Sequence, residues 1–75
     1  EDKFQFTNIY PNPTSGYITI FANNNSRYKL YNFLGKEIYT GQILKGENNV
    51  DLSRFENGTY FIQSDGDFKK IILLK

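Results

Sequence analysis

The chain has 75 residues, enough for one small domain that hides only roughly 60% of the surface its unfolded form exposes, so no sizeable buried catalytic cleft is expected. Nine Lys and Arg against eight Asp and Glu give a net charge of +1, which lacks the basic excess of nucleic-acid binders. The chain has no Cys and no His, which excludes disulfides, thiol catalysis and the commonest general base and metal ligand.

Turn-forming residues recur about every eight to twelve residues, and segments rich in Ile, Tyr, Phe and Thr lie between them, which predicts an all-β sandwich or barrel. The predicted strands are residues 4–10, 17–22, 27–33, 37–44, 49–53, 58–64 and a final strand through 71–74. Their alternation predicts one shared core of Ile18, Ile20, Leu30, Ile38, Val50, Leu52, Tyr60 and Ile62.

The segments between the strands predict the turns. The two prolines of Pro11-Asn12-Pro13 cannot donate to a strand ladder and end the first strand, while residues 23–26, 34–36, 45–47 and 56–58 form the later turns. Gly41 suggests a β-bulge within its strand.

The last hairpin allows a prediction of register. Asp65-Gly66 is a two-residue turn whose geometry matches strand twist, and it sets Tyr60 opposite Ile71 and Gly58 opposite Leu73. The four consecutive apolar residues 71–74 predict a final strand that is covered on both faces.

Side chains that could carry chemistry have simpler structural interpretations. Ser15 and Ser53 are possible nucleophiles without a histidine base, and both fit turns or strand ends. Asp65 and Asp67 have a slight likeness to a calcium loop, but Ca²⁺ requires roughly six to eight oxygen ligands. The sequence therefore predicts no catalytic residue, no metal site and no cofactor.

Surface aromatic and basic residues leave two interpretations open. Tyr31, Tyr39, Phe61 and Phe68 are expected on outer faces, where they either bind sugars by stacking or form cross-strand pairs. Lysines 69, 70 and 75 flank the last strand, a position where lysines often protect a sheet edge from aggregation.

Four blocks of the sequence, in order, resemble the C-terminal sorting domains of the type IX (Por) secretion system, type A. Residues 9–16 (IYPNPTSG) resemble the family's "YPNPTSG" opening, and residues 28–38 (YKLYNFLGKEI) its "YNLLGQEV" segment. Residues 50–53 (VDLS) followed by 57–62 (NGTYFI) resemble "DLS…NGTYFI", and residues 69–75 (KKIILLK) the basic, β-branched tail, with leucines where many members carry valine or lysine.

The resemblance implies a non-catalytic signal domain with an immunoglobulin-like antiparallel β-sandwich fold of about seven strands. Such domains close the C-terminus of proteins exported by Bacteroidetes-type bacteria. The implied partners are an N-terminal passenger protein, the type IX outer-membrane translocon and a sortase-like cysteine protease that commonly removes the domain. The implied location is the periplasm in transit and then the cell surface or the medium, with neither nucleic-acid binding nor stable membrane insertion.

Within this resemblance, residues 8–75 are predicted to be the sorting domain, and residues 1–7 an N-terminal linker that includes the start of the first strand. The predicted recognition residues lie in turns, on two strands and in the basic tail: Pro11, Asn12, Pro13, Gly16, Gly35, Gly58, Tyr60, Lys70 and Lys75. Lys75 is expected to have the least structural role. The lack of Met predicts that the chain is a piece of a longer protein.

The alternative function is a carbohydrate-binding or adhesion β-sandwich module of a secreted enzyme. A sorting domain must be C-terminal, whereas a binding module can lie anywhere, so whether the gene ends at Lys75 discriminates between them. The passenger, the cleavage position and the oligomeric state are not encoded in these patterns.

Overall fold

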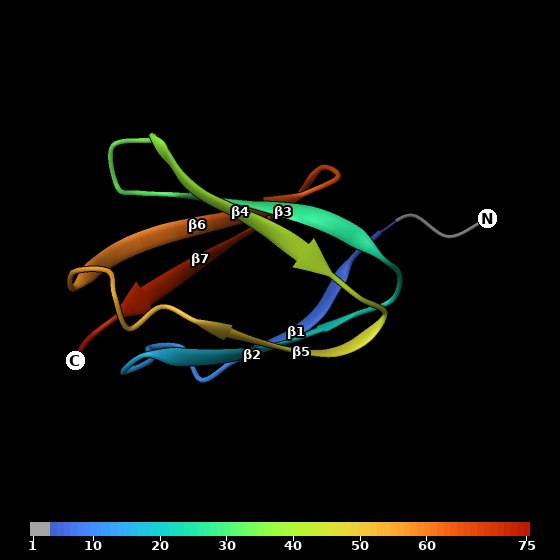
Figure 1. Ribbon diagram of the computed structural model, residues 1–75, viewed down its shortest axis with the longest axis horizontal. Coiled ribbons are helices and arrows are strands. Elements are labelled where there is room, and N and C mark those ends of the chain that lie inside the picture. The colour runs from blue at the N-terminus through green and yellow to red at the C-terminus, as the bar shows by residue number, and fades with distance from the viewer. Residues whose placement is uncertain (1–3) are drawn as a thin grey trace.

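The computed structural model describes residues 4–75, which form two layers of antiparallel strands. One layer contains β1 (Phe6–Tyr10), β2 (Tyr17–Ala22) and β5 (Gly46–Asp51), in the order β1-β2-β5. The other contains β3 (Ser26–Tyr31), β4 (Glu37–Ile43), β6 (Gly58–Ser64) and β7 (Asp67–Leu73), in the order β4-β3-β6-β7 (Figure 1). The predicted all-β sandwich of about seven strands is confirmed.

The order of the strands is that of an immunoglobulin-like sandwich. β1, β2 and β5 take the places of strands A, B and E, while β3, β6 and β7 take those of C, F and G. β4 pairs with β3, where strand C′ lies in variable-type domains. Within residues 4–75 there is no helix long and apolar enough to cross a membrane.

The core fills the space between the two sheets because inward-facing residues alternate along each strand. All of the predicted core residues are buried except Ile38 and Val50, which are partly buried and pack against the core. The core also includes residues that the predicted set omits: Phe4, Phe6, Ala22, Tyr28, Ile43, Ile71 and Leu73. The side chains of Phe4 and Phe6 therefore pack with the domain, while residues 1–3 of the predicted linker lie outside the described residues.

The last hairpin has the predicted register. Tyr60 pairs with Ile71 and Gly58 with Leu73. Asp65 (φ 48°) and Gly66 (φ 89°) are both left-handed, as a type I′ turn requires.

The prediction that β7 is covered on both faces is wrong. Ile71 and Leu73 are fully buried, but Ile72 is only half-buried and Leu74 is 57% exposed beyond the strand. β7 is the outer strand of its sheet, and its outward face has no covering layer.

The bulge predicted at Gly41 is also wrong. Gly41 pairs regularly with Tyr28, and the register shifts instead at Ile38, between the Leu30–Tyr39 and Tyr31–Glu37 pairs. A Cβ atom at Gly41 would lie 2.6 Å from the ring of Tyr28. Glycine is needed here because an aromatic ring lies across the strand.

Several strand boundaries differ from the predicted ones, and at two of them an asparagine side chain bonds to the adjoining backbone. β3 ends at Tyr31 and not at residue 33, since the Asn32 side chain starts a turn. β5 begins at Gly46 and not at residue 49. The turn predicted at 45–47 is therefore wrong for residues 46 and 47, which lie in β5. The Asn48 carboxamide accepts from the Leu44 N–H and donates to the Leu44 carbonyl, and so closes the turn before them.

Candidate recognition surface

Most of the predicted recognition residues lie at one end of the sandwich, which we call the Lys75 end. It comprises the loops 11–16, 32–36 and 52–57 together with residues 74–75, on the left of Figure 1. The strand pairings Tyr17–Asp51, Tyr31–Glu37 and Gly58–Leu73 bring these loops to the same end. The loops 23–25, 44–45 and 65–66 lie at the opposite end.

The segment Pro11 to Thr14 covers the outer edge of β7 and thereby joins the two sheets. The Asn12 side chain donates to the Lys70 carbonyl (2.7 Å) and accepts from the Ile72 N–H (2.9 Å). Thr14 then continues the pairing in parallel: its N–H donates to the Ile72 carbonyl (2.8 Å), and its carbonyl accepts from the Leu74 N–H (2.8 Å). The Asn12 carboxamide supplies the contacts that two prolines without N–H donors cannot make.

Thr14 and Gly16 fix the conformation of this loop. The hydroxyl of Thr14, which is only 3% exposed, donates to the Tyr17 carbonyl and accepts from the Gly16 N–H. The Gly16 carbonyl accepts from the Leu52 N–H, which ties the loop to the end of β5. Thr14 was not among the predicted site residues, although a hydroxyl two residues before a turn glycine is typical of this kind of turn.

Gly35 belongs to a short turn that a single asparagine stabilises. The Asn32 side chain accepts from the Leu34 and Lys36 N–H groups, and the Asn32 carbonyl accepts from the Gly35 N–H. Gly35 has φ +84°, a left-handed conformation that glycine adopts without strain. The turn places Phe33 and Leu34 at its tip.

Tyr60 has a structural role that resembles the tyrosine corner of immunoglobulin-like domains. Its hydroxyl donates to the Glu56 carbonyl, four residues upstream, at the start of β6. Burial, with a smaller contribution from the charge of Glu56, raises the pKa of the Tyr60 hydroxyl. Gly58, with φ +155°, begins the same strand next to this bond.

The two predicted lysines differ in their surroundings. Lys70 is exposed at mid-strand in β7, opposite Phe61 on the outer face, and its carbonyl accepts from the Asn12 side chain. Lys75 donates through its backbone N–H to the Asn57 side chain and through Nζ to the Ser53 carbonyl, each at 2.9 Å. The expectation that Lys75 has the least structural role of the selected residues is wrong, because its two bonds link the tail to the loop 52–57.

The predicted outer aromatic residues contact one another or neighbouring side chains. Phe61 stacks on Phe68 with ring centroids 5.8 Å apart, and Tyr31 contacts Phe68 at 6.4 Å. Tyr39 lies against Tyr28 and Phe55, and the Arg54 guanidinium sits 4.5 Å above the Tyr39 ring. These contacts agree with cross-strand packing, one of the two interpretations that the sequence left open.

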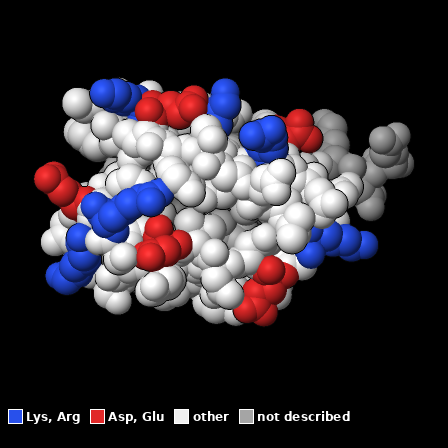
Figure 2. Space-filling model, in the orientation of Figure 1, with Lys and Arg blue, Asp and Glu red and all other residues white. Residues whose placement is uncertain are grey.

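Charges of both signs are interspersed on the face in Figure 2, with no broad region of one sign. At the Lys75 end, hydrogen bonds from Ser53 hold the pKa of the Asp51 carboxyl below its usual range. Its Oδ1 accepts from the Ser53 N–H at 2.8 Å, which gives Ser53 the turn role predicted for it.

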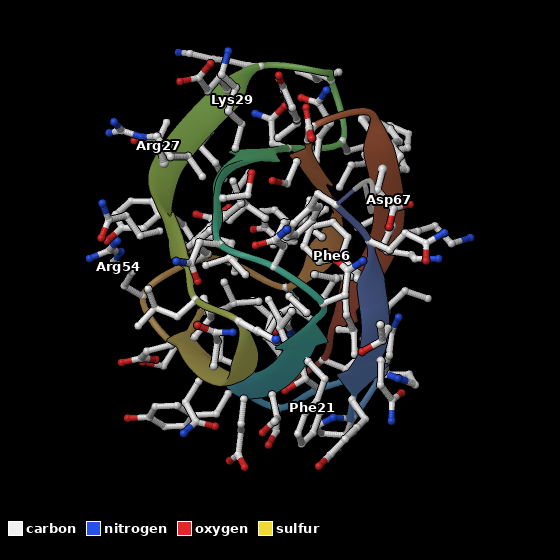
Figure 3. All side chains as sticks on the ribbon, turned by 90° about the vertical axis from the view of Figure 1, so that its right-hand side faces the viewer. Phe6, Phe21, Arg27, Lys29, Arg54 and Asp67 are labelled. Atoms are coloured by element: carbon white, nitrogen blue, oxygen red, sulfur yellow. The ribbon has the colours of Figure 1, made fainter. Side chains whose placement is uncertain are left out.

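At the opposite end, Asp67 is a structural residue. One carboxylate oxygen accepts from the Phe6 N–H (2.8 Å) and the other from the Phe68 N–H (3.0 Å). Figure 3 shows Asp67 on β7 beside β1, with Phe6 pointing between the sheets. Residues 4–75 contain no group of three or more His, Cys, Asp or Glu side chains that could hold a metal ion.

Comparison with known proteins gives one family. Residues 8–73 match the model of the secretion system C-terminal sorting domain. Searches of curated proteins and of solved structures found no match.

Proposed function

The chain belongs to the family of secretion system C-terminal sorting domains, and we propose that it directs a passenger fused to its N-terminal side through the type IX outer-membrane translocon. The family acts as a type IX sorting signal and implies export to the cell surface or the medium. On our proposal the passenger first crosses the inner membrane and waits in the periplasm, and a sortase-like cysteine protease at the surface then removes the domain. The domain itself is not an enzyme.

One observation supports this proposal above the others: residues from three separate segments of the family match come together at the Lys75 end, beside Lys75 itself. The Pro11–Gly16 loop lies on β7, Gly35 and Gly58 hold neighbouring turns, and Lys75 bonds to the loop 52–57. Rigid loops on a sandwich scaffold suit recognition because they present a fixed surface to a partner.

The predicted residues divide into two roles in this proposal. We assign the shape of the surface to Pro11, Asn12, Pro13, Gly16, Gly35, Gly58 and Tyr60, which hold backbone turns or the tyrosine corner. We assign direct contact with the export machinery to Lys70 and Lys75, whose side chains are exposed. On this proposal the sorting domain comprises residues 8–75, and the end of the preceding linker packs into its core through Phe4 and Phe6.

A fusion experiment tests the proposal. Residues 1–75 are joined to the C-terminus of a fluorescent protein that carries an inner-membrane export leader, in a host with a type IX system. We expect fluorescence at the cell surface or in the medium, and only in the periplasm when the domain is omitted or the translocon is deleted. A wild-type fusion that stays in the periplasm of the competent host would refute the proposed function.

A further inference from the structure

The tip of the turn 32–36 exposes two large apolar side chains side by side in the sequence. Phe33 is 74% exposed and Leu34 is 85% exposed, the highest values among the large hydrophobic residues that are exposed. The chain has seven phenylalanines, and the other six all contact another aromatic ring. Phe33 alone has no ring partner among the described residues.

The fold does not require apolar residues at this position. The turn is held by the Asn32 side chain and by the left-handed Gly35, while the Asn32 N–H donates to the Lys36 carbonyl at 2.9 Å. None of these contacts uses the side chain of Phe33 or Leu34. A rigid turn that presents two unpaired apolar side chains has little conformational entropy to lose on binding.

The surroundings of the tip fit a protein partner. A groove of about 270 Å³ runs between residues 32–34 and residues 56–60, and it offers polar groups of Asn32, Glu56 and Asn57 beside the two apolar side chains. Further exposed apolar residues, Leu74, Tyr17 and Tyr10, lie at the same end. Apolar anchors beside polar groups are typical of protein interfaces.

We propose that Phe33 and Leu34 are the anchor residues of this surface and insert into an apolar pocket on a protein component of the export machinery. The inference rests on the proposed function and names the part of the domain that makes the contact. A membrane is the weaker candidate, because a single fourteen-carbon acyl chain gives only marginal membrane binding, and these two side chains are smaller.

Leucines at the two ends of the molecule provide a matched comparison. Leu34→Ser and Leu44→Ser remove the same side chain from exposed loops, since Leu44 is 58% exposed at the opposite end. Phe68→Ser removes a phenylalanine that is 56% exposed on β7. Because that ring stacks on Phe61, this variant also shows what loss of surface packing alone does to export. A Phe33→Leu, Leu34→Phe exchange keeps both side chains apolar. Each variant is made in the fluorescent fusion and in the isolated chain.

Truncation of an interface anchor weakens binding by about 30-fold or more. We therefore expect the double variant Phe33→Ser, Leu34→Ser to lower the surface-to-periplasm ratio of the fusion at least about tenfold. Thermal unfolding of the isolated chain should be unchanged, because surface substitutions have small effects. Leu44→Ser, Phe68→Ser and the exchange variant should be exported like the wild type.

The possible failures are distinguishable. Wild-type export together with normal export of Phe33→Ser, Leu34→Ser overturns the anchor and leaves the sorting function in place. Failure of the wild-type fusion overturns the sorting function itself. Binding of the purified chain to phosphatidylethanolamine–phosphatidylglycerol vesicles that is lost in Phe33→Ser, Leu34→Ser overturns the protein pocket in favour of a lipid surface.

Discussion

Replacing Asn12 with alanine tests whether the Pro11–Thr14 segment fastens the two sheets together. The Asn12 carboxamide makes two hydrogen bonds to the edge of β7, one to the Lys70 carbonyl and one from the Ile72 N–H. Alanine removes both, while the following Thr14 pairing with Ile72 and Leu74 stays possible. We expect the segment to detach more often from the β7 edge in the variant.

The size of the effect follows from these two bonds. A typical intramolecular hydrogen bond contributes a net 0.5–1.5 kcal/mol, and Asn12 is exposed, so water partly replaces what is lost. We expect Asn12→Ala to lower the free energy of unfolding by about 1–2 kcal/mol. For a domain of this size that corresponds to a decrease in Tm of roughly 4–16 °C.

Thermal and urea unfolding followed by circular dichroism measure this change, and hydrogen exchange at the Ile72 amide locates it. The control is Asn24→Ala, since the Asn24 side chain is exposed and bonds only to the N–H of the next residue. Asn12→Asp keeps an acceptor for the Ile72 N–H and removes the donor, and it should fall between the two. If Asn12→Ala and Asn24→Ala have the same Tm and Ile72 exchange is unchanged, the segment does not fasten β7.

Four further outcomes are expected. Gly58→Val should lower the free energy of unfolding by about 1–3 kcal/mol, the cost of a strained backbone. Gly58 has φ +155°, and an added Cβ would meet no atom within 4 Å, so the cost comes from the backbone alone; an unchanged Tm would contradict this. Gly41→Ala should cost about 1–3 kcal/mol through overpacking, since its Cβ would meet Tyr28 at 2.6 Å; wild-type urea stability would refute the contact. Burial raises the pKa of Tyr28 above its ordinary 10.0, so the contribution of its neutral hydroxyl to folding stability is complete below pH 10 and is lost as pH rises through the folded pKa. Tyr28→Phe should therefore reduce the loss of stability at alkaline pH, and urea midpoints that vary with pH as in the wild type would argue against it. Replacing Lys70 and Lys75 with Gln removes the exposed bond from Lys75 Nζ to the Ser53 carbonyl and should lower the free energy of unfolding by no more than about 1 kcal/mol, yet lower export of the fusion. Full export would refute direct contact of these lysines with the export machinery.

Much of the fold is predictable because it depends on local patterns. Alternation along the strands identifies Ile18, Ile20 and Leu30 as core, and the Asp65-Gly66 turn fixes the last register. The prediction fails where the local conformation depends on a side chain from a different strand. Gly41 signals a bulge when read alone, and only the Tyr28 ring on the neighbouring strand explains it.

The sequence identifies several residues of the candidate site, but it does not indicate which contacts they make. The resemblance selects Pro11, Asn12 and Lys75 without indicating that Asn12 bonds to β7 or that Lys75 reaches Ser53, because both contacts join segments far apart in the chain. Tyr60 was selected as a recognition residue, yet its hydroxyl is used within the fold. Phe33 and Leu34 lie inside a matching block but were not selected, because only their exposure in the structure distinguishes them from core residues.

Because β7 is bonded to the Pro11–Thr14 segment, only some substitutions can test the export signal without also unfolding the domain. An uncovered edge strand is a template for aggregation, and the sequence suggested that lysines protect this one. The structure protects it differently, because Asn12 and Thr14 pair with the edge from Lys70 to Leu74. Deleting residues 71–74 would remove the fully buried Ile71 and Leu73 and release the Pro11–Thr14 segment, so a loss of export would report unfolding. Substitutions that keep β7 intact, at the tip of the turn 32–36 or at the exposed lysines, are therefore the ones that can identify the signal.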